Sequence, residues 1–179
     1  MLIVIGSMSS VSRQQVAALA EVQDVEVVSI PVHVLLAGSL SEPWAEFSVK
    51  LSKTLHQGCD IAVVLESVGQ LDHSKGRLLS SALAAMVSPF RDTVGSLIAS
   101  GGETARAILE RWGIASLRLI GELEPGLPIA AVEEQERYLP VMTKAGAFGN
   151  LQTLVQCLRY LHTLERSSAG QNASIRVSR

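Results

Sequence analysis

The chain has 179 residues, of which 47% are hydrophobic and 18% charged, and its net charge is -2. This length suits one domain with a proper core, and the composition argues against disorder. The small negative charge leaves no basic stripe, so we expect no nucleic-acid partner. All apolar runs are shorter than the roughly 18 residues of a membrane span, and the start lacks the charges of a signal peptide. We therefore expect a cytoplasmic protein without membrane contact.

Cysteine and histidine usage gives no sign of a disulfide or of a metal centre. Cys59 and Cys157 lie in apolar contexts without CxxC spacing, which is typical of buried, reduced thiols. The histidines are scattered, with no pair at i, i+4 and no companion cysteine, so we predict no metal site built from them.

Strand and helix patterns alternate along the first half of the chain. Three short and almost continuous apolar runs predict strands that are buried on both faces. These runs are residues 2–5, 26–30 and 61–65. Apolar residues at helical spacing follow each run. The predicted helices begin near Ser12, at Ser41 and at Ser74.

The second half continues the alternation and then adds short strands. A buried strand ends near Ser100, and a helix runs from there to Trp112 because its apolar residues fall at i, i+3, i+4 and i+7. Short strands are predicted at 117–120, 129–132 and 138–142, the last two as a hairpin, before a final helix after Asn150. Residues 165–179 are polar and aperiodic. We expect them to form a flexible tail and residues 1–164 to form the domain.

These elements together predict an α/β fold with three layers, in which helices cover both faces of a mostly parallel sheet. Ligands of such sheets bind at the carboxyl ends of the strands. Four glycine-containing loops follow predicted strands and are expected to gather at that edge. They lie at Gly6, Gly69, Gly101 and Gly146.

The loop at Gly101 and Gly102 has the chemistry of a phosphate cradle. It joins a buried strand directly to a helix, so free N–H groups and the positive end of the helix dipole face outward there. Glycine also lets a bulky ligand approach the main chain. A tight turn that binds nothing fits the same two residues, and only several such loops together would indicate a nucleotide site.

Familiar nucleotide and hydrolase signatures are absent, since the sequence contains no GxxxxGK[ST], no GxGxxG and no GxSxG. Four other motifs nevertheless occur together. They are residues 6–9 with Gln14 and Gln15, residues 101–104, residues 125–128, and residues 143–149. This combination resembles the carboxy-terminal nucleotide-binding domain of the four-carbon acid sugar kinase family, also known as Hrp-dependent type III effectors, over about residues 1–150.

The resemblance implies an ATP-dependent kinase that uses Mg²⁺ and phosphorylates threonate, erythronate or 3-oxo-tetronate. The sugar acid is expected in a separate or missing amino-terminal domain, so this chain would hold half an active site, and a homo-oligomer remains open. Carried over residue by residue, the nucleotide contacts are Ser7, Ser9, Gly101, Gly102, Glu103, Thr104 and Gly146, with Lys144 adding charge at the phosphates. Because a carboxylate repels phosphate, Glu103 is expected to contact the ribose hydroxyls, to bind Mg²⁺ or to make a structural contact with a neighbouring loop. No catalytic base is assigned in this chain.

Two positions depart from the pattern of the family. The last loop usually reads Lys-Ser-Gly-Asn-Phe-Gly, and here the serine and the asparagine are Ala145 and Ala147. Both changes remove hydrogen-bonding side chains. Three hypotheses therefore stand: the ATP-binding domain of an acid sugar kinase, a degenerate interaction or regulatory module, and an unrelated α/β domain that binds a phosphorylated metabolite.

Overall fold

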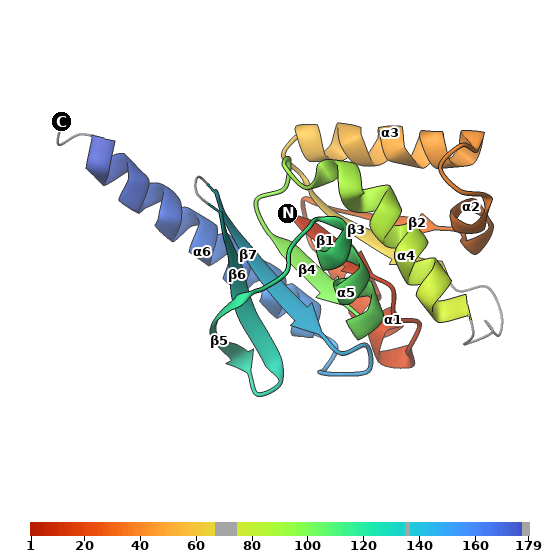
Figure 1. Ribbon diagram of the computed structural model, residues 1–179. Coiled ribbons are helices and arrows are strands. Elements are labelled where there is room, and N and C mark those ends of the chain that lie inside the picture. The colour runs from red at the N-terminus through yellow and green to blue at the C-terminus, as the bar shows by residue number, and fades with distance from the viewer. Residues whose placement is uncertain (67–74, 135–136, 177–179) are drawn as a thin grey trace.

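The computed structural model describes residues 1–66, 75–134 and 137–176 (Figure 1). Seven strands form one sheet in the order β2-β3-β1-β4-β7-β6-β5. The strands are β1 (Leu2–Ile5), β2 (Val25–Ile30), β3 (Asp60–Leu65), β4 (Leu97–Ser100), β5 (Arg118–Glu124), β6 (Leu127–Glu134) and β7 (Arg137–Lys144). The helices are α1 (Ser10–Ala20), α2 (Val32–Ala37), α3 (Glu42–His56), α4 (Gly76–Val87), α5 (Gly102–Arg111) and α6 (Thr153–Arg176), with a 3-10 turn, η2, at Ser88–Phe90.

The sheet is mostly parallel, as the sequence predicts. Strands β2, β3, β1, β4 and β7 run in the same direction. Strands β6 and β5 extend the sheet beyond β7 by antiparallel pairing. Every residue of β1 and of β4 is buried, which explains why these strands read as continuous apolar runs.

Helices cover both faces of the sheet, so the three-layer α/β architecture is confirmed. One core cluster joins the sheet to α2, α3, α4 and α5, and includes Leu51, Leu83 and Ile108. The cluster on the other face joins the sheet to α1 and α6, and includes Leu19 and Leu158. Figure 1 shows α3 and α4 lying together on one side while α6 crosses the other.

Some boundaries differ from the sequence-based expectation. Helix α2 follows Pro31 directly, where we expected only a loop, and a six-residue helix is too short to show a clear apolar period. We expected the polar residues between the predicted strands 129–132 and 138–142 to separate these strands. Glu133 and Glu134 instead belong to β6 and Arg137 to β7, and the two strands pair as far as Glu134 and Arg137. The glycine loop at Gly69 and the predicted helix start at Ser74 lie outside the described residues.

The C-terminal segment also differs from the expected aperiodic tail. Helix α6 continues to Arg176, and Figure 1 shows it extending beyond the sheet. Residues 165–176 contain no proline, the residue that breaks a helix most strongly, so the helix can propagate from its packed first turns. The division of the chain after residue 164 stays a prediction.

Candidate functional site

The carboxyl ends of β1, β4 and β7 lie side by side and carry the predicted loops. Ile5 is level with Ser100, and Ser100 is level with Lys144. The first residue of each loop bonds to the next strand: Gly6 N donates to Ser100 O (3.1 Å), and Gly101 N donates to Lys144 O (2.8 Å). Helix α1 then leaves toward one face of the sheet and α5 toward the other. Such divergence of neighbouring connections opens a crevice at the sheet edge.

Two of the predicted glycines sit where no side chain fits. A Cβ on Gly6 would lie 2.0 Å from Thr104 Oγ1, and a Cβ on Gly146 would lie 2.2 Å from Ser7 Oγ. These contacts join the first loop to both of its neighbours. The glycines therefore permit the close approach of three segments that are far apart in the sequence.

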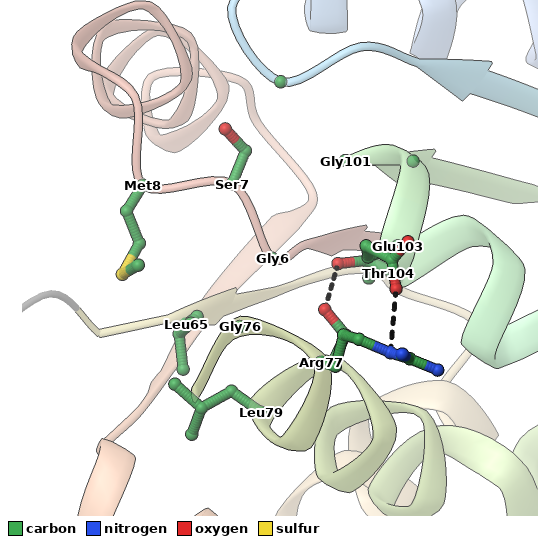
Figure 2. Close-up of a pocket in the computed structure, with 13 residues that line it drawn as sticks. Gly6, Ser7, Met8, Leu65, Gly76, Arg77, Leu79, Gly101, Glu103 and Thr104 are labelled. Carbon is green, nitrogen blue, oxygen red and sulfur yellow. Dashed lines mark hydrogen bonds and ion pairs between the residues drawn. The ribbon is translucent and has the colours of Figure 1, made fainter. Parts of the chain in front are cut away.

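A pocket of about 360 Å³ opens between these loops and the first turn of α4. Described residues that line it are Gly6, Ser7, Met8, Leu65, Gly76, Arg77, Leu79, Ser80, Gly101, Gly102, Glu103, Thr104 and Gly146. Figure 2 shows Met8, Leu65 and Leu79 on one side and Gly101, Glu103 and Thr104 on the other. The pocket thus has one apolar side and one polar side.

Helix α5 begins at the polar side without any side-chain cap. Gly101 precedes its first turn with φ 110° and ψ 122°, a conformation that other residues rarely adopt. The first-turn N–H groups have no acceptor within the helix, and no side chain caps this end. At the start of α1, by contrast, Ser9 Oγ accepts from Ser12 N (3.0 Å). Of these two helices, α5 is therefore the one whose N-terminal end offers free donors and a positive dipole to an anion.

Six of the eight residues predicted to contact a nucleotide line the pocket, whereas Ser9 and Lys144 do not. Both side chains instead hold the loop after β7. Ser9 Oγ donates to Gly146 O (3.0 Å), and Lys144 Nζ donates to the same oxygen (3.0 Å). Ser12 Oγ supplies a third donor at 2.7 Å. The carbonyl of Gly146 is thus fixed inward by three side chains.

Lys144 lies almost completely inside the protein, with 2% of its surface exposed. Burial lowers the pKa of its ammonium group. Burial also raises the pKa of the Cys157 thiol to about 12. This thiol is therefore protonated at neutral pH, as expected for a buried, reduced cysteine.

Glu103 lies at the rim of the pocket between two arginines. Its carboxylate is 3.3 Å from Arg106 and 3.9 Å from Arg77, and Figure 2 shows the second of these pairs. Below it, the hydroxyls of Thr104 and Ser80 lie 3.3 Å apart. Sequence reasoning missed Arg77, Ser80, Leu65 and Leu79, because these residues belong to helical or strand patterns that give no signal of a ligand. It also assigned no contact to Met8, although this residue lies in the loop at residues 6–9.

The residues present fit a phosphate-bearing ligand better than a metal centre built by protein alone. Within the residues that the structure describes, no group of three or more His, Cys, Asp or Glu side chains could hold a metal ion. Glu103 is the one carboxylate among the described lining residues. Magnesium needs only one or two protein carboxylates when phosphates supply the other ligands.

Among the described residues, no helix has the length and apolar character to cross a membrane.

Fold and site together define a doubly wound α/β protein with a crevice at the carboxyl edge of its sheet, where the uncapped start of α5 lies. The chain belongs to the family of nucleotide-binding C-terminal domains, whose model matches residues 2–154. This membership confirms the family that the four sequence motifs indicated.

Curated relatives are sugar acid kinases. A D-threonate kinase from Cupriavidus necator is 37% identical over 156 residues, which cover 83% of this chain and 36% of that protein. A D-threonate kinase from Salmonella typhimurium is 28% identical over 91% of this chain and 43% of its own length. A 3-oxo-tetronate kinase from Burkholderia multivorans is 29% identical over 57% of this chain and 23% of its own length. This chain therefore spans less than half the length of these relatives.

Solved structures share the fold. A protein from Bordetella bronchiseptica, described as a domain of unknown function with bound citrate in a domain-swapped dimer, matches with a TM-score of 0.73 and 25% identity. That match covers 88% of this chain and 39% of the other. A Salmonella typhimurium protein described as a putative tRNA synthase matches with a TM-score of 0.66 and 20% identity, over 89% of this chain and 40% of its own. At that identity, the second likeness concerns the fold alone.

Proposed function

We propose that this chain is the nucleotide-binding part of an acid sugar kinase. It binds ATP with Mg²⁺ in the cytoplasm and, with a sugar-acid-binding domain, transfers a phosphoryl group to a four-carbon sugar acid. D-Threonate is the first candidate because the relative with 37% identity carries that name. Erythronate and 3-oxo-tetronate have the same carbon number and remain alternatives. A homo-oligomer belongs to the same proposal, because the Bordetella bronchiseptica relative is described as a dimer.

The observation that carries the proposal is the uncapped start of α5 inside a pocket that three loops share. A helix terminus stabilises an exposed charge by only about 0.3–1 kcal/mol. Micromolar affinity needs about 8 kcal/mol, so several loops must act on one ligand. Gly6, Gly101 and Gly146 line one cavity, which meets this requirement.

The proposed roles follow from the chemistry of the lining groups. The N–H groups of Gly102, Glu103 and Thr104 and the Ser7 hydroxyl would donate to phosphate oxygens, as at other helix N-termini. The carboxylate of Glu103 would hold Mg²⁺ beside the phosphates or accept from the ribose hydroxyls. Phosphoryl transfer depends mainly on positioning and on neutralising charge, so these contacts suffice for the share of catalysis that this chain supplies.

A second candidate is a module that has lost ATP binding. Ala145 and Ala147 favour it, because both stand where the family usually has hydrogen-bonding side chains. Both alanines are exposed, and the Gly146 carbonyl between them is held by other side chains. The shape of the loop therefore does not depend on the two missing side chains, which supports the kinase proposal.

The experiment that tests the proposal is thermal unfolding with and without millimolar Mg-ATP. If the ligand concentration exceeds the dissociation constant a hundredfold, linkage predicts about 2.7 kcal/mol of stabilisation, or a rise of roughly 5–11 °C for a domain of this size. No shift with any nucleotide would leave the degenerate module or the metabolite binder. A sugar phosphate that competes with ATP would favour the metabolite binder.

Gly102→Pro is the matched variant. Proline is favoured at the first position of a helix and removes one N–H that has no partner there. The preceding Gly101 has ψ 122°, which a following proline accepts. The melting temperature without ligand should therefore change little, while the shift with Mg-ATP should fall by half or more. A full shift in this variant would mean that ATP binds elsewhere on the protein.

A further inference from the structure

The ammonium group of Lys144 is enclosed by the loop that follows it. Its Nζ donates to three carbonyl oxygens of that loop: Ala145 O at 2.8 Å, Gly146 O at 3.0 Å and Phe148 O at 3.2 Å. The lysine is 2% exposed. An ammonium group has three N–H donors, so these bonds use all of them. None is left to reach a phosphate in the pocket.

The partners of this buried charge are neutral. Within the described residues, no ion pair joins Lys144 to a carboxylate, and the titratable group beside it is the protonated thiol of Cys157 on α6. An isolated buried charge is costly unless dipoles replace the water it has lost. Backbone carbonyls solvate the ammonium here, much as they would solvate a small monovalent cation.

Lys144 also connects the three loops of the pocket. Its own carbonyl accepts from Gly101 N (2.8 Å), which fixes the loop before α5. Its ammonium shares the Gly146 carbonyl with Ser9 and Ser12, which fixes the loop after β7 against the start of α1. Because the carbonyl of Gly146 points inward, its Cα, which carries no Cβ, packs against Ser7 at the pocket.

We propose that Lys144 is a positioning residue: a tethered internal cation that closes the loop after β7 against α1 and thereby shapes the nucleotide pocket, without contacting the phosphates. This inference rests on the proposed function in its consequence for ATP, while the ordering of the loop can be measured without any ligand. It replaces the expectation that Lys144 supplies charge at the phosphates.

The test compares wild type with Lys144→Ala and Lys144→Met. Alanine leaves a space for a small cation, and methionine fills the space without charge. In both variants three carbonyls of the loop lose a charged donor. We expect the backbone amide of Phe148, which donates to Ala145 O (3.0 Å) across the loop, to exchange with deuterium at least about tenfold faster, and the affinity for Mg-ATP to fall by a similar factor.

Rescue separates a missing cation from general damage. Propylammonium added to Lys144→Ala should restore slow exchange in the loop and recover much of the ATP affinity. Tetramethylammonium, which has no N–H donor, should not, and neither ion should rescue Lys144→Met, because its side chain occupies the space. If Lys144→Ala is too unstable to measure at ambient temperature, recovery of its melting temperature by propylammonium is the equivalent readout.

Two results would overturn the inference. In the first, the loop exchanges as in wild type in both variants, whether or not ATP affinity falls; a fall with an unchanged loop would make Lys144 a phosphate ligand. In the second, propylammonium and tetramethylammonium act alike on Lys144→Ala. Failure of wild type to bind Mg-ATP would contradict the proposed function alone, because loop exchange and its rescue would still decide the role of Lys144.

Discussion

At the scale of single residues, the pocket depends on glycines, because a Cβ atom would not fit at two of its positions. Gly6 and Gly146 each face a hydroxyl-bearing side chain across a distance that no Cβ tolerates. Gly102 differs, because a Cβ there would meet no atom within 4 Å. The same residue type therefore serves packing at two positions and access to the main chain at the third.

Gly6→Ala should destabilise the protein by about 3 kcal/mol or more, because the new methyl group overlaps Thr104 Oγ1 and crowds the rest of that side chain. Thr104→Ala removes Oγ1 and Cγ2, the first of which is the nearest obstructing atom. In that background the cost of Gly6→Ala should fall by at least about 1 kcal/mol, as expected for residues in contact. Urea unfolding of the single and double variants measures both values.

The control for this cycle is Gly102→Ala, which should leave the free energy of unfolding unchanged or slightly higher. Strictly additive costs for Gly6→Ala and Thr104→Ala would contradict the steric explanation.

Residue patterns predicted the glycine loops, but they did not predict the contacts that some neighbouring side chains make. Gly101 and Gly146 could be found because glycine within two residues of a strand end commonly marks a tight turn or a close approach to the backbone. The contacts of Lys144 and Ser9 could not, since both depend on a carbonyl that reaches them only in the folded chain. Leu65 and Leu79 gave no signal because apolar residues at strand or helix spacing read as core.

At the scale of elements, the two helices that flank the crevice differ at their starts. Helix α1 is closed by Ser9, whereas α5 has no side-chain cap. An uncapped helix end costs stability unless water or a ligand satisfies its N–H groups. Side-chain capping therefore stabilises the start of α1, which contacts the loop after β7, and the N–H groups at the start of α5 stay open to the pocket.

Ser9→Ala should cost about 1 kcal/mol or more, because it removes the cap of α1 together with a bond to the Gly146 carbonyl. Ser41 provides a matched control, since it occupies the same cap position in α3 but makes no side-chain bond to that helix. Ser41→Ala should cost less than half as much, with its bond to Gly38 O as the main loss. Equal changes in the midpoint of denaturation would argue against the capping role of Ser9.

Elements with a strong period could be predicted, and short or polar ones could not. The buried parallel strands and the amphipathic α3 and α5 followed from apolar spacing alone. Helix α2 was missed because six residues carry too little pattern. The extension of α6 to Arg176 was missed because a polar segment shows no apolar stripe even where its backbone is helical.

At the scale of the whole molecule, the pocket is one half of the proposed reaction site. The Cupriavidus necator and Salmonella typhimurium D-threonate kinases that this chain matches are more than twice the length of the matching region. The crevice offers donors for phosphates at the start of α5. The additional length of these relatives is consistent with the proposal that a second domain binds the acceptor.

A chimera tests this division of labour. Replacing the matched region of the Cupriavidus necator D-threonate kinase with this chain should give a protein that converts ATP to ADP in the presence of D-threonate. The isolated chain should bind Mg-ATP and transfer no phosphoryl group. Gly102→Pro within the chimera should lower its turnover strongly while D-threonate binding persists. Phosphorylation of D-threonate by the isolated chain would refute the assignment.

The position of β1 in the sheet also bears on the order in which the molecule folds. This first strand lies between β3 and β4, whose paired residues begin at Ile61 and Leu97. Contacts between such distant segments form slowly, because closing the long intervening loops costs chain entropy before the contacts repay it. The pocket further requires Gly146, so a nascent chain has no binding site until nearly all of its core has been synthesised. Nucleotide binding would therefore report that the whole sheet has assembled.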